Sequence, residues 1–457
     1  MVFAVKSKNV LTPAGMREAS ILIDDGKIID VLSHHNIHGC ELTDYNELVL
    51  MPALTDTHVH INEPGRTEWE GFKTATMAAA AGGITTLVDM PLNSLPVTTN
   101  VKALNKKIDS AKDKIYVDVG FYGGFIPNNI SDLAELIQNG VFGLKSFMID
   151  SGLVEFPNVT EEDLRKGVSH LRNVPHRALP LLVHAEIDCG FEKTPAYDEC
   201  CFNSFLETRP REWENKAIKI LIDLCREFKY PIHIVHLSSS DAIEMIKSAK
   251  SEGLPLTVET CPHYLFFSSE EISDKDTRFK CTPPIRENEN REKLWDAVKD
   301  GTIDFIVSDH SPCNPELKFM DKGSFEEAWG GISSLQFGLS VIWTEARKRG
   351  LTLNVVSKLM CENTAKFIGL EMKKGKIEKG YDADIIIFDP DKKFIVEENK
   401  IFHRHKETPY SGRELYGVVE TTFLRGEKVF NNGKIISSPL GEVVLNKLET
   451  SIVKPSC

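Results

Sequence analysis

Two histidines separated by a single residue, His58 and His60, follow a mostly apolar run that begins at Glu47. Such a run predicts a strand that is buried on both faces. Side chains two residues apart on a strand point the same way, so both imidazoles can converge at the carboxyl end of this strand. Neutral imidazole is the commonest protein ligand for divalent transition metals. An isolated pair of this kind is more often two partly exposed loop histidines, so other segments must decide between the two interpretations.

Four further apolar runs carry, or end in, a side chain that could bind a metal. These side chains are Lys145 within residues 141–148, His184 near the end of 179–186, His236 near the end of 231–237, and Asp309 directly after 303–308. Each alone has an ordinary structural explanation, such as a rim hydrogen bond, a lysine whose ammonium reaches water, or a turn. Six such residues in five separate strands favour a metal site over coincidence.

A charge count makes Lys145 the unusual member of this set. Four neutral imidazoles and one carboxylate supply a single negative charge against the four positive charges of two divalent cations. Carboxylation of Lys145 by carbon dioxide would remove its positive charge and add an anionic bridge between the cations. The alternative is a substrate-binding or salt-bridged lysine beside a single metal ion.

Three other histidines are predicted to lie outside the ligand set. His233 and His263 are interpreted as supporting or structural residues, and His310 is expected to face away from its neighbour Asp309.

The elements that must position these side chains alternate along the middle of the chain. Strands are predicted over residues 49–60, 84–90, 115–123, 141–148, 179–186, 231–237, 254–260 and 303–308. Helices are predicted over residues 67–81, 102–112, 132–138, 161–172, 212–228, 240–251, 291–299 and 354–368. Eight strand–helix units predict an α/β fold with a closed (β/α)₈ barrel, whose active site lies at the carboxyl ends of the strands. An open doubly wound sheet is the alternative, but no Gly-x-Gly-x-x-Gly motif follows the first strand.

Both ends of the chain are instead rich in short strands and tight turns. Residues 20–24 and 27–31 flank the turn Asp25-Gly26, and residues 376–390 and 417–436 have a similar pattern. We therefore predict a small β-sandwich domain assembled from residues 1–50 and 371–457, with the catalytic barrel in residues 51–370.

Composition excludes several classes of protein. The chain has 457 residues, of which 41% are hydrophobic and 26% charged, and its net charge of −13 argues against a nucleic-acid partner. We see no apolar run of membrane-spanning length and no signal peptide, and the terminal Pro455-Ser456-Cys457 is not a Ser-Lys-Leu address. Ten scattered cysteines predict reduced thiols. The expected compartment is intracellular, cytoplasmic by default, with a peroxisome or mitochondrion left open.

The motifs around these residues resemble the cyclic amidohydrolases of the amidohydrolase superfamily over essentially the whole chain. The matching stretches are Asp56-Thr57-His58-Val59-His60, Leu144-Lys145-Ser146, Val183-His184-Ala185-Glu186, Val235-His236-Leu237-Ser238 and Val307-Ser308-Asp309-His310-Ser311-Pro312. The resemblance implies a barrel with a composite β domain, a homotetramer and two divalent ions. Zinc is the default, and manganese, cobalt or iron are open. The resemblance also implies the ligand set His58, His60, carboxylated Lys145, His184, His236 and Asp309.

Within that group the chain is most similar to the allantoinases. Dihydroorotases carry an arginine for the substrate carboxylate two residues after the histidine pair, where this chain has Asn62. A neutral amide suits an uncharged ring. Residues 63–72, 90–94 and 328–332 are also similar to allantoinases.

The expected activity is therefore hydrolytic opening of the hydantoin ring of allantoin, a small-molecule substrate of purine catabolism. Asp309 is expected to carry the proton, and Asn62, Asn93 and Ser311 are candidate substrate contacts, although Asn93 and Ser311 are equally well explained as turn residues. Dihydroorotase activity, dihydropyrimidinase or hydantoinase activity, and a non-catalytic relative stay as alternatives.

Overall fold

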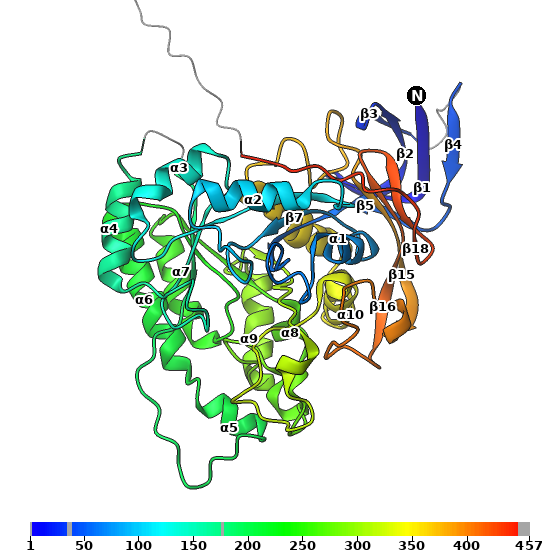
Figure 1. Ribbon diagram of the computed structural model, residues 1–457. Coiled ribbons are helices and arrows are strands. Elements are labelled where there is room, and N and C mark those ends of the chain that lie inside the picture. The colour runs from blue at the N-terminus through cyan, green and yellow to red at the C-terminus, as the bar shows by residue number, and fades with distance from the viewer. Residues whose placement is uncertain (1, 34–38, 175–177, 447–457) are drawn as a thin grey trace, which may run out of the picture.

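The computed structural model describes residues 2–33, 39–174 and 178–446. Within these ranges a barrel of parallel strands with surrounding helices lies beside a β-sheet formed by the two ends of the chain (Figure 1). The barrel holds every candidate ligand of the predicted metal site.

Short parallel strands form the centre of the barrel. In the described part of the chain they pair in two runs, β6-β7-β8 and β9-β10-β11-β12-β13-β14. Their bounds are β6 (Leu54–Val59), β7 (Ile84–Asp89), β8 (Asp118–Phe121), β9 (Gly123–Gly124), β10 (Leu144–Phe147), β11 (Leu181–His184), β12 (Ile232–Ile234), β13 (Leu256–Thr260) and β14 (Phe305–Ile306). Only Tyr122 separates β8 from β9, so together these two strands fill one position and the barrel has eight.

The barrel closes between β6 and the segment that follows β14. Val59 and His310 form a parallel bridge, and the backbone N–H of His60 donates to the carbonyl of His310 at 2.8 Å. The carboxylate of Asp56 accepts a hydrogen bond from the backbone N–H of Ser308 at 3.1 Å. The predicted (β/α)₈ barrel is therefore confirmed, and the open sheet is excluded.

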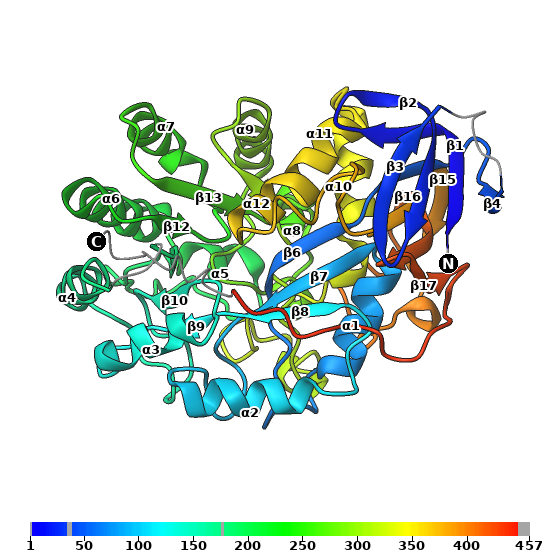
Figure 2. The same ribbon diagram turned by 90° about the horizontal axis from the view of Figure 1, so that it is seen from above.

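Helices surround these strands, as the view from above shows (Figure 2). They are α1 (Phe72–Ala81), α2 (Val101–Ala111), α3 (Leu133–Gln138), α4 (Glu161–Leu171), α5 (Phe202–Glu207), α6 (Arg211–Phe228), α7 (Ile243–Ser251), α8 (Pro262–Phe266), α9 (Asn288–Lys299), α10 (Gly338–Lys348), α11 (Leu353–Ser357) and α12 (Asn363–Phe367). A π-helical turn, Lys358–Glu362, joins the last two. Among the described residues, we find no helix with the length and apolar character that crossing a bilayer requires.

The second body is one sheet that joins the two chain ends. Its strand order is β18-β17-β16-β15-β5-β1-β2-β3, and β4 pairs with β1. The strands are β1 (Phe3–Thr12), β2 (Gly15–Asp24), β3 (Lys27–Leu32), β4 (Glu41–Asp44), β5 (Val49–Pro52), β15 (Ile385–Ile395), β16 (Glu414–Leu424), β17 (Glu427–Asn431) and β18 (Lys434–Ile435). Antiparallel pairing of β5 with β15 connects residues more than 330 positions apart in the chain. The predicted domain boundaries, at 50/51 and 370/371, stay a prediction.

The first predicted strand, residues 49–60, is two strands in the structure. β5 belongs to the sheet of the chain ends, whereas β6 belongs to the barrel. The change occurs at Pro52, which has no N–H to donate. After it, the N–H of Ala53 donates to Asp384 and the N–H of Leu54 donates to Gly83. A continuous apolar run therefore passes from one sheet to the other without a polar break.

The helix α10 was missed by the sequence patterns. Its first six residues are Gly-Leu-Ser-Val-Ile-Trp, which give little contrast between two faces. The structure explains this composition, because α10 packs between the barrel and the sheet. Ser340 donates to the carbonyl of Gly417 at 2.6 Å, and the indole of Trp343 donates to the carbonyl of Pro390 at 2.8 Å.

A buried charge cluster also ties the barrel to the sheet. The ammonium of Lys374 lies 2.6 Å from Asp384 and 3.0 Å from Asp118, the first residue of β8. Arg425 contacts the same Asp118 carboxylate at 2.6 Å. Burial alone would lower the pKa of Lys374, but Asp384, Asp118 and Asp382 raise it well above the ordinary value.

Replacing Lys374 is expected to destabilise the protein strongly. The Lys374→Met variant leaves the buried Asp384 without a cation, which should cost about 3–5 kcal/mol of unfolding free energy. The matched control is Lys112→Met, because Lys112 and its partner Asp109 are 65% and 67% exposed and such a pair contributes less than about 1 kcal/mol. Urea unfolding measures both variants, and equal midpoints would contradict a structural role for the cluster.

Candidate metal centre

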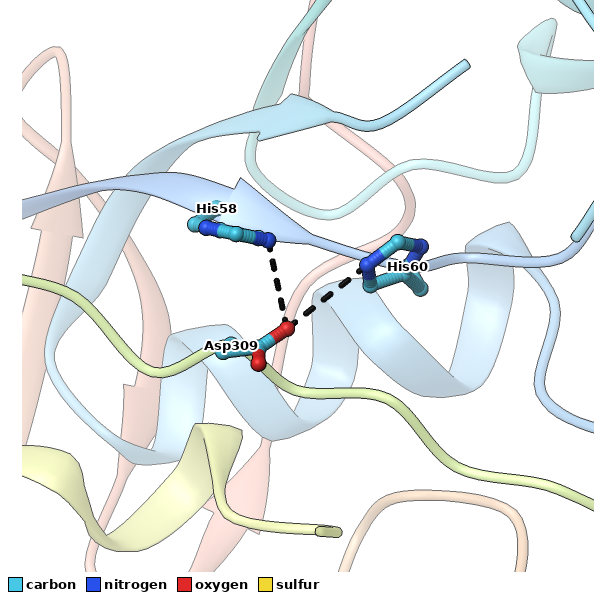
Figure 3. Close-up of side chains that lie close together, drawn as sticks. All are labelled: His58, His60 and Asp309. Atoms are coloured by element: carbon cyan, nitrogen blue, oxygen red, sulfur yellow. Dashed lines mark ion pairs between the residues drawn. The ribbon is translucent and has the colours of Figure 1, made fainter. Parts of the chain in front are cut away.

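His58, His60 and Asp309 meet where the barrel closes. His58 lies in β6, His60 follows that strand, and Asp309 follows β14. The Nε2 atom of His58 lies 3.2 Å from Oδ1 of Asp309, and Nε2 of His60 lies 3.6 Å from the same oxygen (Figure 3). The two imidazoles thus approach one carboxylate oxygen from one side, as the alternation of side chains along a strand predicts.

The other three predicted ligands surround this group from neighbouring strands. Lys145 lies in β10, His184 ends β11, and His236 follows β12. The ring centroids of His58 and His236 are 5.5 Å apart, and those of His184 and His236 are 4.7 Å apart. The charge of Lys145 acts on the neighbouring imidazoles and on Asp309. The structure therefore brings together all six residues that the sequence singled out.

The protonation states of the histidines suit metal binding. Burial, followed by the charge of Lys145, lowers the pKa of His58 and His60 well below the ordinary value. Burial, followed by the neighbouring His184, does the same for His236. These imidazoles are therefore neutral near pH 7 and keep a nitrogen lone pair for a cation.

The buried polar atoms of the centre include two without a hydrogen-bond partner. Within the described residues, Nζ of Lys145 and Nδ1 of His236 have none, although both side chains are almost fully buried. A buried, unpaired ammonium is costly. Burial lowers the pKa of Lys145, which favours the neutral amine that carbon dioxide can carboxylate. The donor set of four imidazoles, one carboxylate and one modifiable amine fits a pair of divalent cations.

Two carboxylates behind the histidines were missed from the sequence. Oε1 of Glu259, in β13, lies 2.5 Å from Nδ1 of His58, and Oε2 of Glu259 lies 3.0 Å from Nε2 of His233. Glu186 accepts from Nε2 of His184 at 2.7 Å. Carboxylates in this position orient metal-binding imidazoles and fix their tautomers. For Glu259, the available signal was an acidic residue inside an otherwise buried strand.

The three remaining histidines have other surroundings. His233 is bonded to Thr257 at 2.8 Å and to Glu259, so both of its ring nitrogens are occupied. His310 faces Glu70 at 3.3 Å, away from Asp309, as expected. His263 is buried near Asp309, and neither of its ring nitrogens has a partner among the described residues.

The residues predicted to contact the substrate lie close to the centre, but some of their polar groups already bond to other protein groups. Asn62 donates to the carbonyl of Pro312 at 3.0 Å, while its Oδ1 has no partner among the described residues. Nδ2 of Asn93 lies 3.3 Å from Nδ1 of His60. The backbone N–H of Ser311 donates to Ile332. Asn62 and Asn93 also adopt φ angles of 67° and 68°, as turn residues do.

A cavity of about 540 Å³ is lined by described residues that include none of the six candidate ligands. Arg209 lines it and lies 3.4 Å from Glu186, the carboxylate that holds His184. Trp213, Lys280 and Trp329 line other parts of its wall. The cavity is large enough to hold a small cyclic amide.

Comparison with known proteins agrees with the geometry. Residues 49–429 match the family model described as the amidohydrolase family. The allantoinase of Streptomyces avermitilis is 47% identical, over 96% of this chain and 98% of that protein. The allantoinase of Arabidopsis thaliana is 45% identical, over 96% of this chain and 90% of that protein.

Solved structures extend the likeness to the fold. The L-hydantoinase (dihydropyrimidinase) from Arthrobacter aurescens superimposes with a TM-score of 0.88 at 27% identity, and the match covers 97% of this chain and 99% of that one. The family match over most of the chain and the full-length allantoinase relatives lead to one conclusion: this chain belongs to the amidohydrolase family, as a hydrolase of cyclic amides.

Proposed function

We propose that this protein is an allantoinase, which hydrolyses the hydantoin ring of allantoin to give allantoate. The observation that carries the proposal is the convergence of four histidines, one buried lysine and one aspartate at one end of the barrel. Full-length identity of 47% to an allantoinase supports the choice of substrate.

The same six residues would hold two divalent cations. His58, His60, His184, His236 and Asp309 supply imidazole and carboxylate ligands, and Lys145, carboxylated by carbon dioxide, supplies the bridge. Zinc is the expected metal, while manganese, cobalt and iron also suit these ligands. When bound, the cations supply a water that ionises near neutral pH and a polarised substrate carbonyl.

The chain's own residues would then direct the proton. The oxygen of the ionised water bonds to the ring carbonyl carbon, and the bond from that carbon to the ring nitrogen breaks. Asp309 accepts the proton that the water loses and donates it to the departing nitrogen, and the new carboxylic acid releases its own proton to solvent, so the ring-opened product carries a carboxylate and a neutral ureido group. Glu259 and Glu186 would hold His58 and His184 in place throughout.

The ring would be recognised by uncharged groups. Asn62 stands where a guanidinium would be needed for an acidic ring, and its free Oδ1 is a buried acceptor. Asn93 and Ser311 are the other proposed contacts for ring amides. The implied homotetramer and intracellular location stay predictions.

A second candidate activity is that of a dihydropyrimidinase or hydantoinase, favoured by the structural likeness to the Arthrobacter aurescens enzyme. Parallel assays of allantoin, dihydrouracil and dihydroorotate separate the candidates. We expect kcat/KM for allantoin to exceed the other two values by roughly 100-fold, because a site matched to one ring's polar groups leaves them unpaired with another. A higher kcat/KM for dihydrouracil or dihydroorotate would replace the proposed substrate, and metal-loaded protein inert on all three would indicate a non-catalytic relative.

Asp309→Asn should reduce kcat on allantoin by about 10²–10⁴-fold, because an amide cannot accept the proton. Elemental analysis must accompany the assay, since Asp309 is also a proposed ligand, and kcat is compared per metal-loaded site. Asp241→Asn, at an exposed carboxylate paired with Arg211, is the control. Near-normal turnover in the fully metal-loaded Asp309→Asn variant would show that Asp309 does not transfer the proton.

Carboxylation of Lys145 predicts that bicarbonate assists metal reconstitution. Metal-free protein given zinc in buffer without carbon dioxide should recover less activity than protein given zinc with bicarbonate. Lys145→Met should recover equally poorly in both buffers. Mass spectrometry of the loaded wild type checks the modification directly, and an unmodified amine together with full recovery in both buffers would disprove the bridge.

A further inference from the structure

A second group of potential ligands also includes Asp309. Cys261 directly follows β13, and His263 lies in α8. One ligand atom each from Cys261, His263 and Asp309 lie within 4.8 Å of one another. Cys261 and His263 are not among the six residues assigned to the cation pair.

His263 has an unusual environment for a buried histidine. Its side chain is fully buried, yet neither ring nitrogen has a hydrogen-bond partner among the described residues. Buried polar groups are nearly always paired, so such a group needs an explanation. Burial lowers the pKa of His263 to about 3, so the ring is neutral and can offer a lone pair to a cation. Within the described part of the chain, the only close ring contact of His263 is with Tyr264, at 4.2 Å between the two ring centroids.

Cys261 supplies a soft donor beside this ring. The thiol is free and fully buried. Burial raises its pKa well above the ordinary value, so it stays protonated until a metal displaces the proton. A thiolate, an imidazole and a carboxylate together suit zinc or cadmium.

Asp309 can serve both groups because a carboxylate has two oxygens. Its Oδ1 faces the nitrogens of His58 and His60. In a tetrahedral zinc site the ligand atoms lie about 3.3–3.6 Å apart, since zinc–sulfur and zinc–nitrogen bonds are about 2.3 and 2.0 Å long. The three ligand atoms lie within 4.8 Å of one another, so binding one ion requires them to approach by up to about 1.5 Å.

We propose that Cys261, His263 and Asp309 form an additional, inhibitory site for a soft divalent ion such as cadmium or excess zinc. Binding displaces the thiol proton to solvent and forms metal bonds to sulfur, nitrogen and a carboxylate oxygen, without any oxidation. Asp309 is then held by the added ion and no longer accepts the proton of the attacking water. The inhibitory effect rests on the proposed function, whereas the binding itself does not.

The experiment adds cadmium to the zinc-loaded protein. We expect one further ion to bind by equilibrium dialysis, with thiolate-to-cadmium charge-transfer absorption rising in step and allantoin hydrolysis falling in step. Cys261→Ala should abolish the absorption and raise the cadmium concentration for half-inhibition by at least roughly tenfold, since even indirect partners of a metal ligand change affinity by that factor. Elemental analysis must show that the original zinc is retained.

The matched control is Cys225→Ala, at a buried cysteine in α6 whose thiol contacts the carbonyl of Tyr230. This variant should keep both the absorption and the inhibition. Cys261→Ser replaces the alanine variant if that protein does not fold. Cadmium binding without thiolate absorption, loss of zinc on cadmium addition, or equal inhibition of the Cys261 variant would overturn the site. A protein inactive on allantoin but showing the absorption would keep the site and refute the proposed function.

Discussion

The hydrogen bonds that close the barrel decide where the candidate centre lies. The N–H of His60 reaches the carbonyl of His310, and the carboxylate of Asp56 accepts the N–H groups of both His58 and Ser308 at 3.1 Å. These bonds fasten the first strand to the segment after the last. Asp309, with a φ of 44°, is held between them facing both histidines. Without this closure, residues about 250 positions apart in the chain would have no reason to meet.

Burial raises the free-energy cost of charged groups in the centre and makes the Lys145 amine more nucleophilic. Removing ionisable groups from water favours their neutral forms, so imidazoles lose protons and the Lys145 amine is pushed toward its nucleophilic form. Carboxylates behind the histidines reduce the free-energy cost of burying these polar rings. Glu259 accepts a hydrogen bond from Nδ1 of His58, and Glu186 accepts one from Nε2 of His184. The other ring nitrogen of each histidine is left for a cation. The same low polarity strengthens every charge interaction inside the barrel.

Asp309 lies between two sets of donors with different chemical character. One set consists of hard and intermediate ligands that suit a catalytic pair of cations, and the other adds the thiol of Cys261. The second set depends on the short distance between the ends of β13 and β14, which are neighbours in the barrel. Asp309 therefore lies near a thiol as well as near imidazoles, so cations of different character can compete for this carboxylate.

The sequence by itself determined the barrel and the six side chains of the centre, because both follow from local rules. Strand–helix alternation is visible in short windows, and the carboxyl end of each strand can be located within a few residues. Only the tertiary structure decided that residues 49–60 divide between two sheets, that α10 fills the space between barrel and sheet, and that Glu259 supports His58. The physical reason is distance along the chain. His58 and Glu259 are 201 positions apart, and no local pattern records that a buried acid will face a particular imidazole. The unpaired ring of His263 became visible for the same reason, since a missing partner is a property of packing.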